Sequence, residues 1–453
     1  MAAHTDGTWA STGGCTRVSG DGFASVECEI LLGSRETKDA MRSALEGIRV
    51  LDLSRVLAGP WCSQNLADLG ADVIKVERPG AGDDTRSWGP PFLKDRDGRD
   101  TSDAAYYLAA NRNKRSVTID LACEAGQRAV RELAARCDVV LENYKVGQLA
   151  KYGLDYQSLR AVNPRLVYCS VTGFGQTGPW KHRPGYDFII QGLGGFMSIT
   201  GEADDRPGGG PQKAGVAVSD LMTGMFATQA VLAALFHRER SGEGQYIDIA
   251  LLDVQVAMLA NMNTNYLVSG TPPRRWGNAH PNIVPYQAFR AADQWIILAV
   301  GNDEQYRRFC ALAGRNDLFD DPRFATNRER VRNRETLVPL ITEAIAARPA
   351  QFWLAGLEGA GVPCGPINDL AQVFDNEQVR ARGMRIALER EDAGQIPLVA
   401  SPMNMSATPP SYRLPPPRVG EHTSEVLREV LGYGDEEIEA VRGPSDTSAS
   451  ADA

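Results

Sequence analysis

From residue 48 onward, short apolar runs alternate with longer amphipathic stretches. The run 48–53 predicts a strand, 61–69 a helix and 73–77 a second strand. A strand, a helix and a second strand in this order form a βαβ unit, whose two strands are parallel. The same pattern predicts further strands at 116–120, 138–142, 165–171 and 246–250, and helices at 124–136, 218–238 and 251–268. We therefore expect an α/β fold with a doubly wound, Rossmann-like parallel sheet.

The pattern changes near Gly270, where a Gly/Pro-rich stretch interrupts the helices. Beyond it, the pattern predicts strands at 286–289 and 295–300 and amphipathic helices at 303–314, 334–347 and 350–360. Strand-like pieces within 385–400 and a last helix at 423–431 are expected to pack back on the first domain. We expect a large α/β domain at 45–250, completed by 385–442, and a smaller α/β domain at 265–375. A chain of 453 residues fits two such domains.

The two ends of the chain differ from the rest. Residues 1–44 and 443–453 are rich in small polar residues and lack periodicity, so both are expected to be disordered. The first segment has no apolar core like that of a secretory signal, and it is too acidic for an organelle-targeting sequence. No run approaches the roughly 18 apolar residues that a membrane span needs. We expect a cytoplasmic protein without a membrane partner.

Charge and cysteine usage exclude several classes of function. A net charge of −9 disfavours a nucleic-acid surface, although local basic patches are compatible with it. The eight cysteines show no metal-binding spacing and are expected to be reduced thiols; we predict no metal site. No Gly-x-Gly-x-x-Gly opens the first helix and no P-loop is present, which gives no support to a nicotinamide or nucleotide cofactor.

Asp187 is the first candidate catalytic residue. The predicted strand 165–171 opens into a glycine-punctuated loop, and Asp187 follows this loop just before an apolar, glycine-rich segment. Ligand sites of α/β proteins cluster where buried strands open into such loops. The alternative is that Asp187 caps the helix that follows it.

Basic and amide side chains flank three of the predicted strands. Arg78 follows the second strand, 111–115 precedes the third, and 143–145 follows the fourth, with Lys151 soon after. We expect these clusters on one rim of the sheet, where they would bind an extended, phosphate-bearing anion. The alternative is a solvated charged face.

Several short motifs occur in an order and at a spacing similar to those of class III CoA-transferases. The matching pieces are 45–54, 58–60, 70–77, 113–116, 142–144, 163–166, 172–175, 185–187 and 420–423. Each piece is weak alone, but together they cover about residues 45 to 440. The chain therefore resembles this family, which includes formyl-CoA transferase and carnitine CoA-transferase.

The resemblance implies a catalytic aspartate at Asp187 and CoA or acyl-CoA as a substrate, with no permanently bound cofactor. It also implies a homodimer of two interlocked ring-shaped chains. The CoA contacts that it carries over are Val56, Ala58, Arg78, Ala110, Asn111, Asn113, Lys114, Asn143, Tyr144, Lys145 and Lys151.

An aspartate carboxylate is a competent nucleophile toward a thioester, because thiolate is a good leaving group and the resulting anhydride remains reactive. CoA then attacks the anhydride to give an aspartyl-CoA thioester, and an acceptor acid takes CoA from it. Water must be excluded from such intermediates. Backbone N–H groups in 192–195, or at Gly277 and Asn278, are candidates for binding the developing oxyanion; the alternative for either segment is a tight turn.

The acceptor acid is predicted from the segments 83–91, 111–114, 284–289 and 361–363, which look like those of succinyl-CoA:glutarate CoA-transferase. The multi-glycine loop of formyl-CoA transferases is missing, which disfavours formyl or oxalyl transfer. We expect Arg112 to pair with the remote carboxylate of a dicarboxylic acid, with Gly277 and His280 also at the substrate. The alternative for Arg112 is contact with a CoA phosphate.

Two other functions remain open. α-Methylacyl-CoA racemases of the same superfamily use a histidine that is Arg160 here, and Tyr186 replaces a second histidine, which disfavours proton transfer by imidazole. A non-catalytic acyl-CoA-binding protein would bind CoA without turnover, and an intact Asp187 argues against it.

Overall fold

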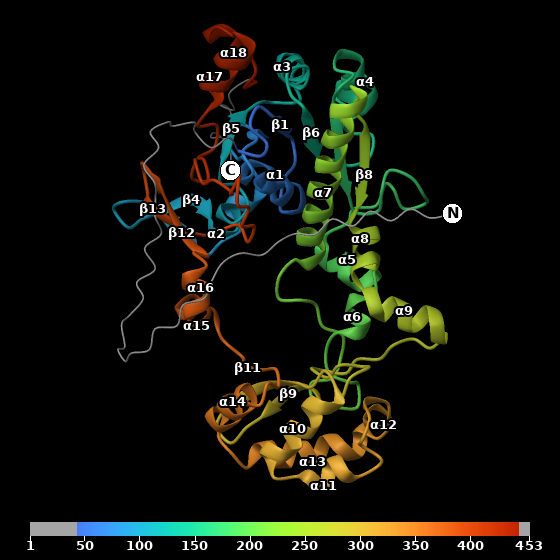
Figure 1. Cartoon of the computed structure of the whole chain (residues 1–453). Helices are drawn as coiled ribbons and strands as arrows, with labels where there is room; N and C mark the ends of the chain where they lie inside the picture. Colours follow the sequence, from blue (N-terminus) through green and yellow to red (C-terminus); the bar gives the residue numbers. More distant parts are fainter. Residues whose placement is uncertain (1–42, 444–453) are drawn as a thin grey trace, which may run out of the picture. The chain divides into compact units, whose positions relative to one another are not determined.

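A six-stranded parallel sheet forms the centre of the computed structural model, which describes residues 43–443 (Figure 1). Its strand order is β5-β2-β1-β6-β7-β8, and every neighbouring pair is parallel. The strands are β1 Arg49–Asp52, β2 Asp72–Glu77, β5 Lys114–Thr118, β6 Val139–Glu142, β7 Val167–Thr172 and β8 Tyr246–Ala250. The predicted α/β fold with a parallel sheet is confirmed.

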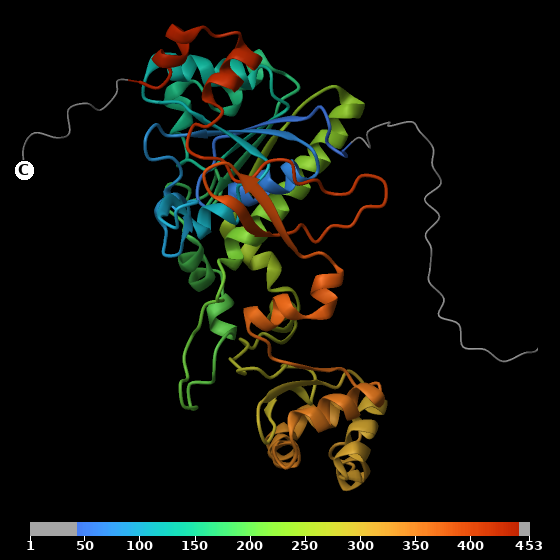
Figure 2. The ribbon, with the colours of Figure 1, turned by 90° about the vertical axis from the view of Figure 1, so that its left-hand side faces the viewer.

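Helices cover both faces of this sheet, and the alternation of strand side chains explains why. Figure 2 shows helices on both sides of the sheet. Val50 belongs to a cluster with residues of α1 and α7, whereas its neighbour Leu51 belongs to a cluster with residues of α3 and the C-terminal helices. The helices of these layers are α1 Ala58–Asp68, α7 Val218–Ser241, α3 Glu124–Ala134, α4 Tyr156–Val162, α17 Thr423–Val426 and α18 Asp435–Ala440. Because both faces are buried, the strands read as continuous apolar runs.

The C-terminal segment lies against β5, the strand at one edge of the sheet. Arg115 of β5 pairs with Glu425 and Glu429 at 3.1 and 2.7 Å. The predicted last helix is α17 followed by a π-helical turn, Leu427–Leu431, and the sequence-based prediction missed α18 beyond it. Before α17, the chain forms the antiparallel pair β12 Arg385–Arg390 and β13 Gly394–Val399.

A third hydrophobic cluster is built from residues between 284 and 364. A three-stranded antiparallel sheet, in the order β11-β10-β9, carries one side of it. Its elements are β9 Tyr286–Arg290, β10 Trp295–Ala299, β11 Cys364–Pro366, α10 Asp303–Ala313, α11 Asn316–Asp320, α12 Asn327–Arg332, α13 Arg334–Ala346 and α14 Ala350–Gly359. The expected limits of the large and small domains stay a prediction.

The remaining elements connect these parts. They are the 3-10 turns Asp84–Ser87 and Leu149–Tyr152, the strands β3 Phe92–Lys94 and β4 Asp100–Ala104, and the helices α2 Ala105–Leu108, α5 Asp187–Leu193, α6 Phe196–Ile199, α15 Leu370–Asp375 and α16 Glu377–Ala381. The helix predicted at 251–268 is divided into α8 Leu251–Met258 and α9 Ala260–Ser269. The division falls at Ala260, whose φ of 43° does not continue a right-handed helix.

Helix α7 departs from the expectation that no segment could span a membrane. Among the described residues it is the one helix that is long and apolar enough for this by length and composition. It packs against α1 and α8, and it buries Ser219, Thr223 and Arg238. These contacts are those of a core helix. Most of the two termini expected to be disordered, with Cys15 and Cys28, lies outside residues 43–443.

Candidate functional site

Asp187 is the first residue of α5, and two glycines bring it next to the end of β7. A Cβ on Gly173, directly after β7, would lie 2.6 Å from the Cα of Gly185. The two backbone segments therefore touch, which only glycine at both positions permits. This crossing directs the chain from Gly185 into α5 at the carboxyl end of the sheet.

The Asp187 carboxylate is bound by the first turn of another helix. Its Oδ1 accepts the backbone N–H of Ser219 at 2.8 Å and that of Asp220 at 3.3 Å, both from α7. Its Oδ2 accepts from Nε2 of Gln191 at 2.6 Å. Free N–H groups at a helix N-terminus, together with the helix dipole, stabilise a negative charge. These contacts hold the carboxyl group of Asp187 at the N-terminus of α7.

The alternative that Asp187 caps the helix following it is wrong. Tyr186 is the N-cap of α5 and makes no capping hydrogen bond with its side chain. Asp187 instead supplies the acceptor that the N-cap of α7, Ala217, does not have. One side chain thus serves α7 as a cap and remains half exposed beside a cavity.

A second carboxyl group, that of Asp220, lies beside Asp187. Burial, and next the charge of Asp187, raise the pKa of Asp220 to about 7. Burial followed by the charges of Asp220 and Asp187 also raises the pKa of Tyr106. The site thus combines two neighbouring carboxyl groups and a phenol.

A cavity of about 210 Å³ opens beside these groups, at the carboxyl ends of β1, β6 and β7. Of the residues that the sequence predicted for CoA, it brings together Val56, Ala58, Asn143, Tyr144 and Lys145. Tyr186 and Asp220 also line it. Asp187 itself does not line this cavity, but its neighbours in the chain and in space do.

The backbone around Val56 is strained and held in place from two sides. Val56 has a φ of 70°, which is rare for a β-branched residue. The side-chain amide of Asn143 accepts from the N–H of Arg55 at 2.9 Å and donates to the carbonyl of Arg55 at 2.7 Å. The loops after β1 and β6 are therefore clamped together at one wall of the cavity. Such strain is characteristic of functional sites.

The cavity has basic residues that the sequence analysis missed. Arg55, Lys181, His182 and Arg183 line it together with Lys145, and we call these five residues the basic wall. The acidic residues in the same lining are Asp220 and Asp84, which pairs with Arg55 at 3.2 Å. The run from Lys181 to Arg183 ends four residues before Asp187, and this proximity was the available signal. Its position is supported by the Arg183 guanidinium, which stacks 4.7 Å from the ring of Trp180.

Two other residues predicted for CoA lie outside the cavity lining. Arg78 is exposed, and its Nη2 lies 3.7 Å from the carboxylate of Asp84. Lys151 is exposed on the 3-10 turn after β6. Their predicted contacts with CoA stay predictions.

The loop 110–114 does not share the rim occupied by the other basic clusters, and that expectation is wrong. Lys114 pairs in register with Val73 near the start of β2, so the loop lies at the opposite edge of the sheet. Ala110, Asn111, Asn113 and Lys114 are buried. Nζ of Lys114 donates to the carbonyl of Pro60 and to Asn111. These residues form an internal polar core at this edge of the sheet.

Arg112 carries a guanidinium that is already paired. It forms a bidentate contact with Asp68, at 2.9 and 2.5 Å, and donates to the carbonyl of Val399 at 2.8 Å. Only 5% of Arg112 is exposed. The expected bidentate pair with a substrate carboxylate requires free guanidinium N–H donors, and those of Arg112 are already bonded to Asp68 and Val399. Its placement therefore gives no support to the predicted role.

At least two of the N–H groups predicted as oxyanion donors are engaged in backbone hydrogen bonds. The N–H of Gly194 donates to Ile190 and that of Gly277 to Gly201, both as backbone hydrogen bonds. His280 stacks on Tyr286, and its Nδ1 accepts the N–H of Asn282 at 3.1 Å. Neither Gly277 nor His280 hydrogen-bonds to Asp187 in the described part of the chain. Their substrate contacts stay predictions.

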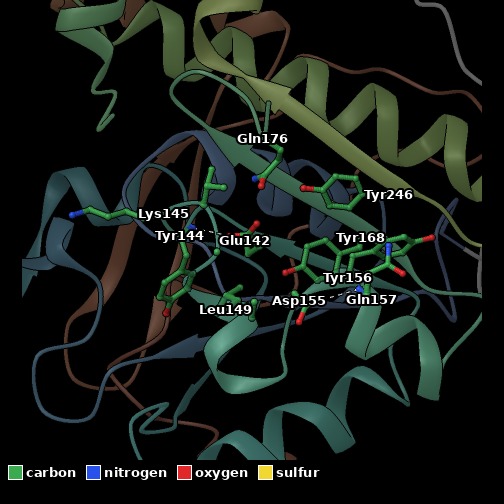
Figure 3. Close-up of a pocket in the computed structure, with 13 residues that line it drawn as sticks. Glu142, Tyr144, Lys145, Leu149, Asp155, Tyr156, Gln157, Tyr168, Gln176 and Tyr246 are labelled. Atoms are coloured by element: carbon green, nitrogen blue, oxygen red, sulfur yellow. Dashed lines mark hydrogen bonds between the residues drawn. The ribbon is translucent and has the colours of Figure 1, made fainter. Parts of the chain in front are cut away.

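A second cavity, of about 300 Å³, lies behind Tyr144 and Lys145, which line both cavities (Figure 3). The carboxyl of Glu142 lies in it and accepts from the N–H of Tyr144 at 2.7 Å and from the hydroxyl of Ser170. Burial raises the pKa of Glu142 to about 7. Figure 3 shows Lys145 extending away from Glu142. No cluster of three metal-binding side chains occurs within residues 43–443.

Comparison with known proteins identifies the family of this chain. Residues 45–423 match the model of CoA-transferase family III. The chain is 55% identical over 386 residues to succinate–glutarate CoA-transferase of Agrobacterium fabrum, which covers 85% of this chain and 95% of that protein. It is 45% identical over 401 residues to succinyl-CoA:glutarate CoA-transferase of Mus musculus, covering 88% and 89%.

A solved structure has the same fold. The crystal structure of a CAIB/BAIF family protein from Brucella suis superposes with a TM-score of 0.76 at 48% identity. The match covers 86% of this chain and all of that one. The chain therefore belongs to CoA-transferase family III and is a CoA-transferase.

Proposed function

We propose that this enzyme transfers CoA from succinyl-CoA to a dicarboxylic acid such as glutarate, with Asp187 as the covalent carrier. The observation that carries the proposal is the Asp187 carboxylate, bound at the N-terminus of α7 beside a cavity with a basic wall. The substrate class comes from relatives at 55% and 45% identity that are named for succinate or succinyl-CoA and glutarate.

The reaction begins when a carboxylate oxygen of Asp187 attacks the thioester carbonyl carbon of the donor. A C–O bond forms, the C–S bond breaks, and CoA leaves as the product of the first step, with an aspartyl anhydride on the enzyme. CoA sulfur then attacks the aspartyl carbonyl, which releases succinate and leaves an aspartyl-CoA thioester. The acceptor carboxylate repeats these two steps in reverse order, and Asp187 is regenerated.

The basic wall suits the charged end of CoA. Arg55, Lys145, Lys181 and Arg183 place positive charge along the cavity, and phosphate groups are the anions of CoA that such charges attract. We propose that Val56, Ala58, Asn143 and Tyr144 form the rest of this binding surface. We propose that the thioester lies near Asp220, which lines the same cavity, and near its neighbour Asp187.

We further propose a homodimer that covers the apolar surface next to Asp187. On α5, Phe188, Ile189 and Leu193 are exposed, and on α9 the exposed fractions of Leu267 and Val268 reach 77% and 82%. Clusters of large apolar side chains of this kind mark protein–protein contacts. A partner over α5 would also exclude water from the anhydride. Light scattering that gives the mass of a monomer at micromolar concentration would contradict this part.

The test is to incubate the enzyme with succinyl-CoA and one acid from glutarate, itaconate, malate or oxalate, and to detect the new acyl-CoA by mass spectrometry. We expect glutaryl-CoA to form fastest. Hydroxylamine added during turnover should convert the Asp187 side chain to a hydroxamate, found in the peptide that contains it. Transfer by an Asp187→Ala enzyme would reject the covalent carrier.

The same assay separates the two alternative functions. An α-methylacyl-CoA racemase would exchange the α-proton of a branched acyl-CoA and form no new acyl-CoA. A non-catalytic binding protein would retain acyl-CoA unchanged. Either result with the intact enzyme would reject the proposed transfer.

A further inference from the structure

Asp220 is a second carboxyl group at the site, and its side chain has no assigned task. Its backbone N–H donates to Asp187, but the carboxyl oxygens of Asp220 make no hydrogen bond or ion pair with any residue in 43–443. The side chain lines the 210 Å³ cavity together with Val171, Gly173 and Leu251. A half-buried carboxyl group without a partner in the protein is available to a ligand.

The ordinary explanation for an acidic residue in a first helical turn is stabilisation of the helix N-terminus. Asp220 occupies such a position in α7. That role is already filled, because Asp187 accepts the N–H groups of Ser219 and Asp220 itself. Asp220 therefore adds a second carboxyl group to an end that is already capped.

The two carboxyl groups have opposite environments. Asp187 accepts three hydrogen bonds, whereas the neighbouring Asp220 carboxyl group accepts none from the described residues. Two neighbouring carboxyl groups in unlike environments divide into a carboxylate and a neutral acid. The neutral acid is the one that faces the cavity, and burial raises its pKa to about 7.

We propose that Asp220 carries the proton for the CoA sulfur: it protonates the sulfur as CoA leaves and takes the proton back when CoA attacks the anhydride. This role rests on the proposed covalent function of Asp187. It gives the site an acid–base residue that is separate from the nucleophile.

The proton balance is as follows. When the Asp187 carboxylate attacks, the C–S electron pair goes to sulfur, and sulfur takes the proton of the Asp220 carboxyl group to leave as a thiol. Asp187 loses its charge in the anhydride while Asp220 gains one, so the net charge of the pair stays the same. In the next step the Asp220 carboxylate removes the S–H proton as sulfur bonds to the aspartyl carbonyl carbon.

The physical benefit is that no unprotonated thiolate forms in a half-buried site beside carboxyl groups. An isolated buried anion is costly, and proton transfer by a well-placed acid removes that cost. The other titratable groups around Asp220 are Asp187, Tyr106, whose pKa is raised, and residues of the cavity lining: Arg55, Asp84, Tyr144, Lys145, Lys181, His182, Arg183 and Tyr186.

The experiment compares thioester donors that differ in the acidity of their leaving thiol. Succinyl-CoA has a weakly acidic alkanethiol, whereas a succinyl thioester of thiophenol has a much more acidic one that leaves without a proton. Thiol release is measured in single-turnover reactions with the intact enzyme and with Asp220→Asn. We expect the variant to be slowed roughly 100-fold or more with succinyl-CoA and only a few-fold with the thiophenol ester.

A matched control is Asp253→Asn, which changes an exposed first-turn acid of the neighbouring helix α8. It should leave both rates unchanged. Equal slowing of the two donors by Asp220→Asn, or no slowing at all, would overturn the proposed proton transfer. A steep dependence of the intact enzyme's rate of thiol release on the acidity of the leaving thiol would also overturn it. This measurement does not require that the variant folds.

Failure of this inference and failure of the proposed function give different results. If Asp187 is not the carrier, the intact enzyme forms no CoA thioester on Asp187, and both proposals fall. If that thioester forms and Asp220→Asn treats both donors alike, only the role of Asp220 falls. Asp220→Glu, which keeps an acid, should recover part of the rate with succinyl-CoA.

Discussion

The carboxylate of Asp187 caps a helix whose first turn lies 32 residues further along the chain, through the 2.8 Å hydrogen bond from the backbone N–H of Ser219. The proposed nucleophile is therefore also a structural acceptor. Loss of its negative charge and loss of its hydrogen bonds are separable, because an asparagine keeps an oxygen at the same place.

This separation predicts different outcomes for two substitutions of Asp187. Both Asp187→Asn and Asp187→Ala should abolish CoA transfer, since neither has a carboxylate. Asp187→Ala should also lower the free energy of unfolding by about 1 kcal/mol, as the loss of a helix cap does, while Asp187→Asn should stay closer to the intact protein. Urea denaturation and the transfer assay measure the two properties.

A matched control exists in α4, where Asp155 accepts the N–H groups of Gln157 and Ser158. Asp155→Ala should cost a similar amount of stability and leave transfer intact. Equal loss of activity in both alanine variants would mean that activity follows helix capping and not the carboxylate.

Glu142 predicts a pH dependence of stability. Burial raises its pKa from 4.5 in the unfolded chain to about 7 in the folded protein. Between these values the folded protein binds more protons than the unfolded chain, so stability falls as pH rises through this window. The free energy of unfolding lost through Glu142 reaches its full value above pH 7 and is on the order of 3 kcal/mol.

Glu142→Gln should remove this loss, because the amide oxygen still accepts from Tyr144 and carries no charge. The variant should be more stable than the intact protein at pH 8 and similar to it at pH 4.5, as measured by urea denaturation at both values. Exposed Glu391→Gln is the control and should show no such pH-dependent gain. A gain of equal size at both pH values would contradict the assigned cause.

Arg112 predicts a loss of stability without a change in acceptor preference. Removal of a partner from a buried ion pair leaves the other charge uncompensated and typically costs 3 kcal/mol or more. Arg112→Ala leaves Asp68, which is fully buried, in this state. We expect a large fall in the free energy of unfolding and equal rate losses with dicarboxylate and monocarboxylate acceptors. A selective loss with dicarboxylates would restore the role predicted from the sequence.

The basic wall predicts an effect limited to the phosphates of CoA. Lys181→Ala and Arg183→Ala should each raise the KM for succinyl-CoA roughly tenfold, since each removes a charge that attracts phosphate. The KM for succinyl-pantetheine, which has no phosphates, should not change. Lys94→Ala removes an exposed lysine that pairs with Asp100 outside the cavity and serves as the control. Equal changes for both donors would show that the wall does not contact the phosphates.

Local sequence pattern predicted the parallel sheet because each of its causes is local. The apolar runs of β1 and β2, the glycine turns and the helix between them specify a βαβ unit within about thirty residues. Asp187 became a candidate because it follows the loop that contains Gly173 and Gly185, but the family resemblance, and not this loop alone, favoured a catalytic role over helix capping. The break at Ala260 had no comparable signal, whereas the acidic first turn of α18, Asp435–Glu437, was a local signal that the sequence-based prediction missed.

The candidate site was predicted only in part, and Arg112 shows why. Its position in a run of basic and amide residues is visible in the sequence, but its partner Asp68 lies 44 residues away. Whether a guanidinium is free or paired depends on that partner. The basic residues of 111–115 were therefore assigned to the wrong edge of the sheet, although those of 143–145 were placed correctly at the cavity.

By itself, the sequence determined the fold class and carried the family motifs that made Asp187 a candidate, because periodicity and turn residues act over a few positions. Only the tertiary structure decided that α7 binds this carboxylate, that Asp220 stands beside it, and that Arg112 is neutralised inside the chain. The charge state and accessibility of a side chain depend on groups brought near it by folding, and sequence distance does not reveal them.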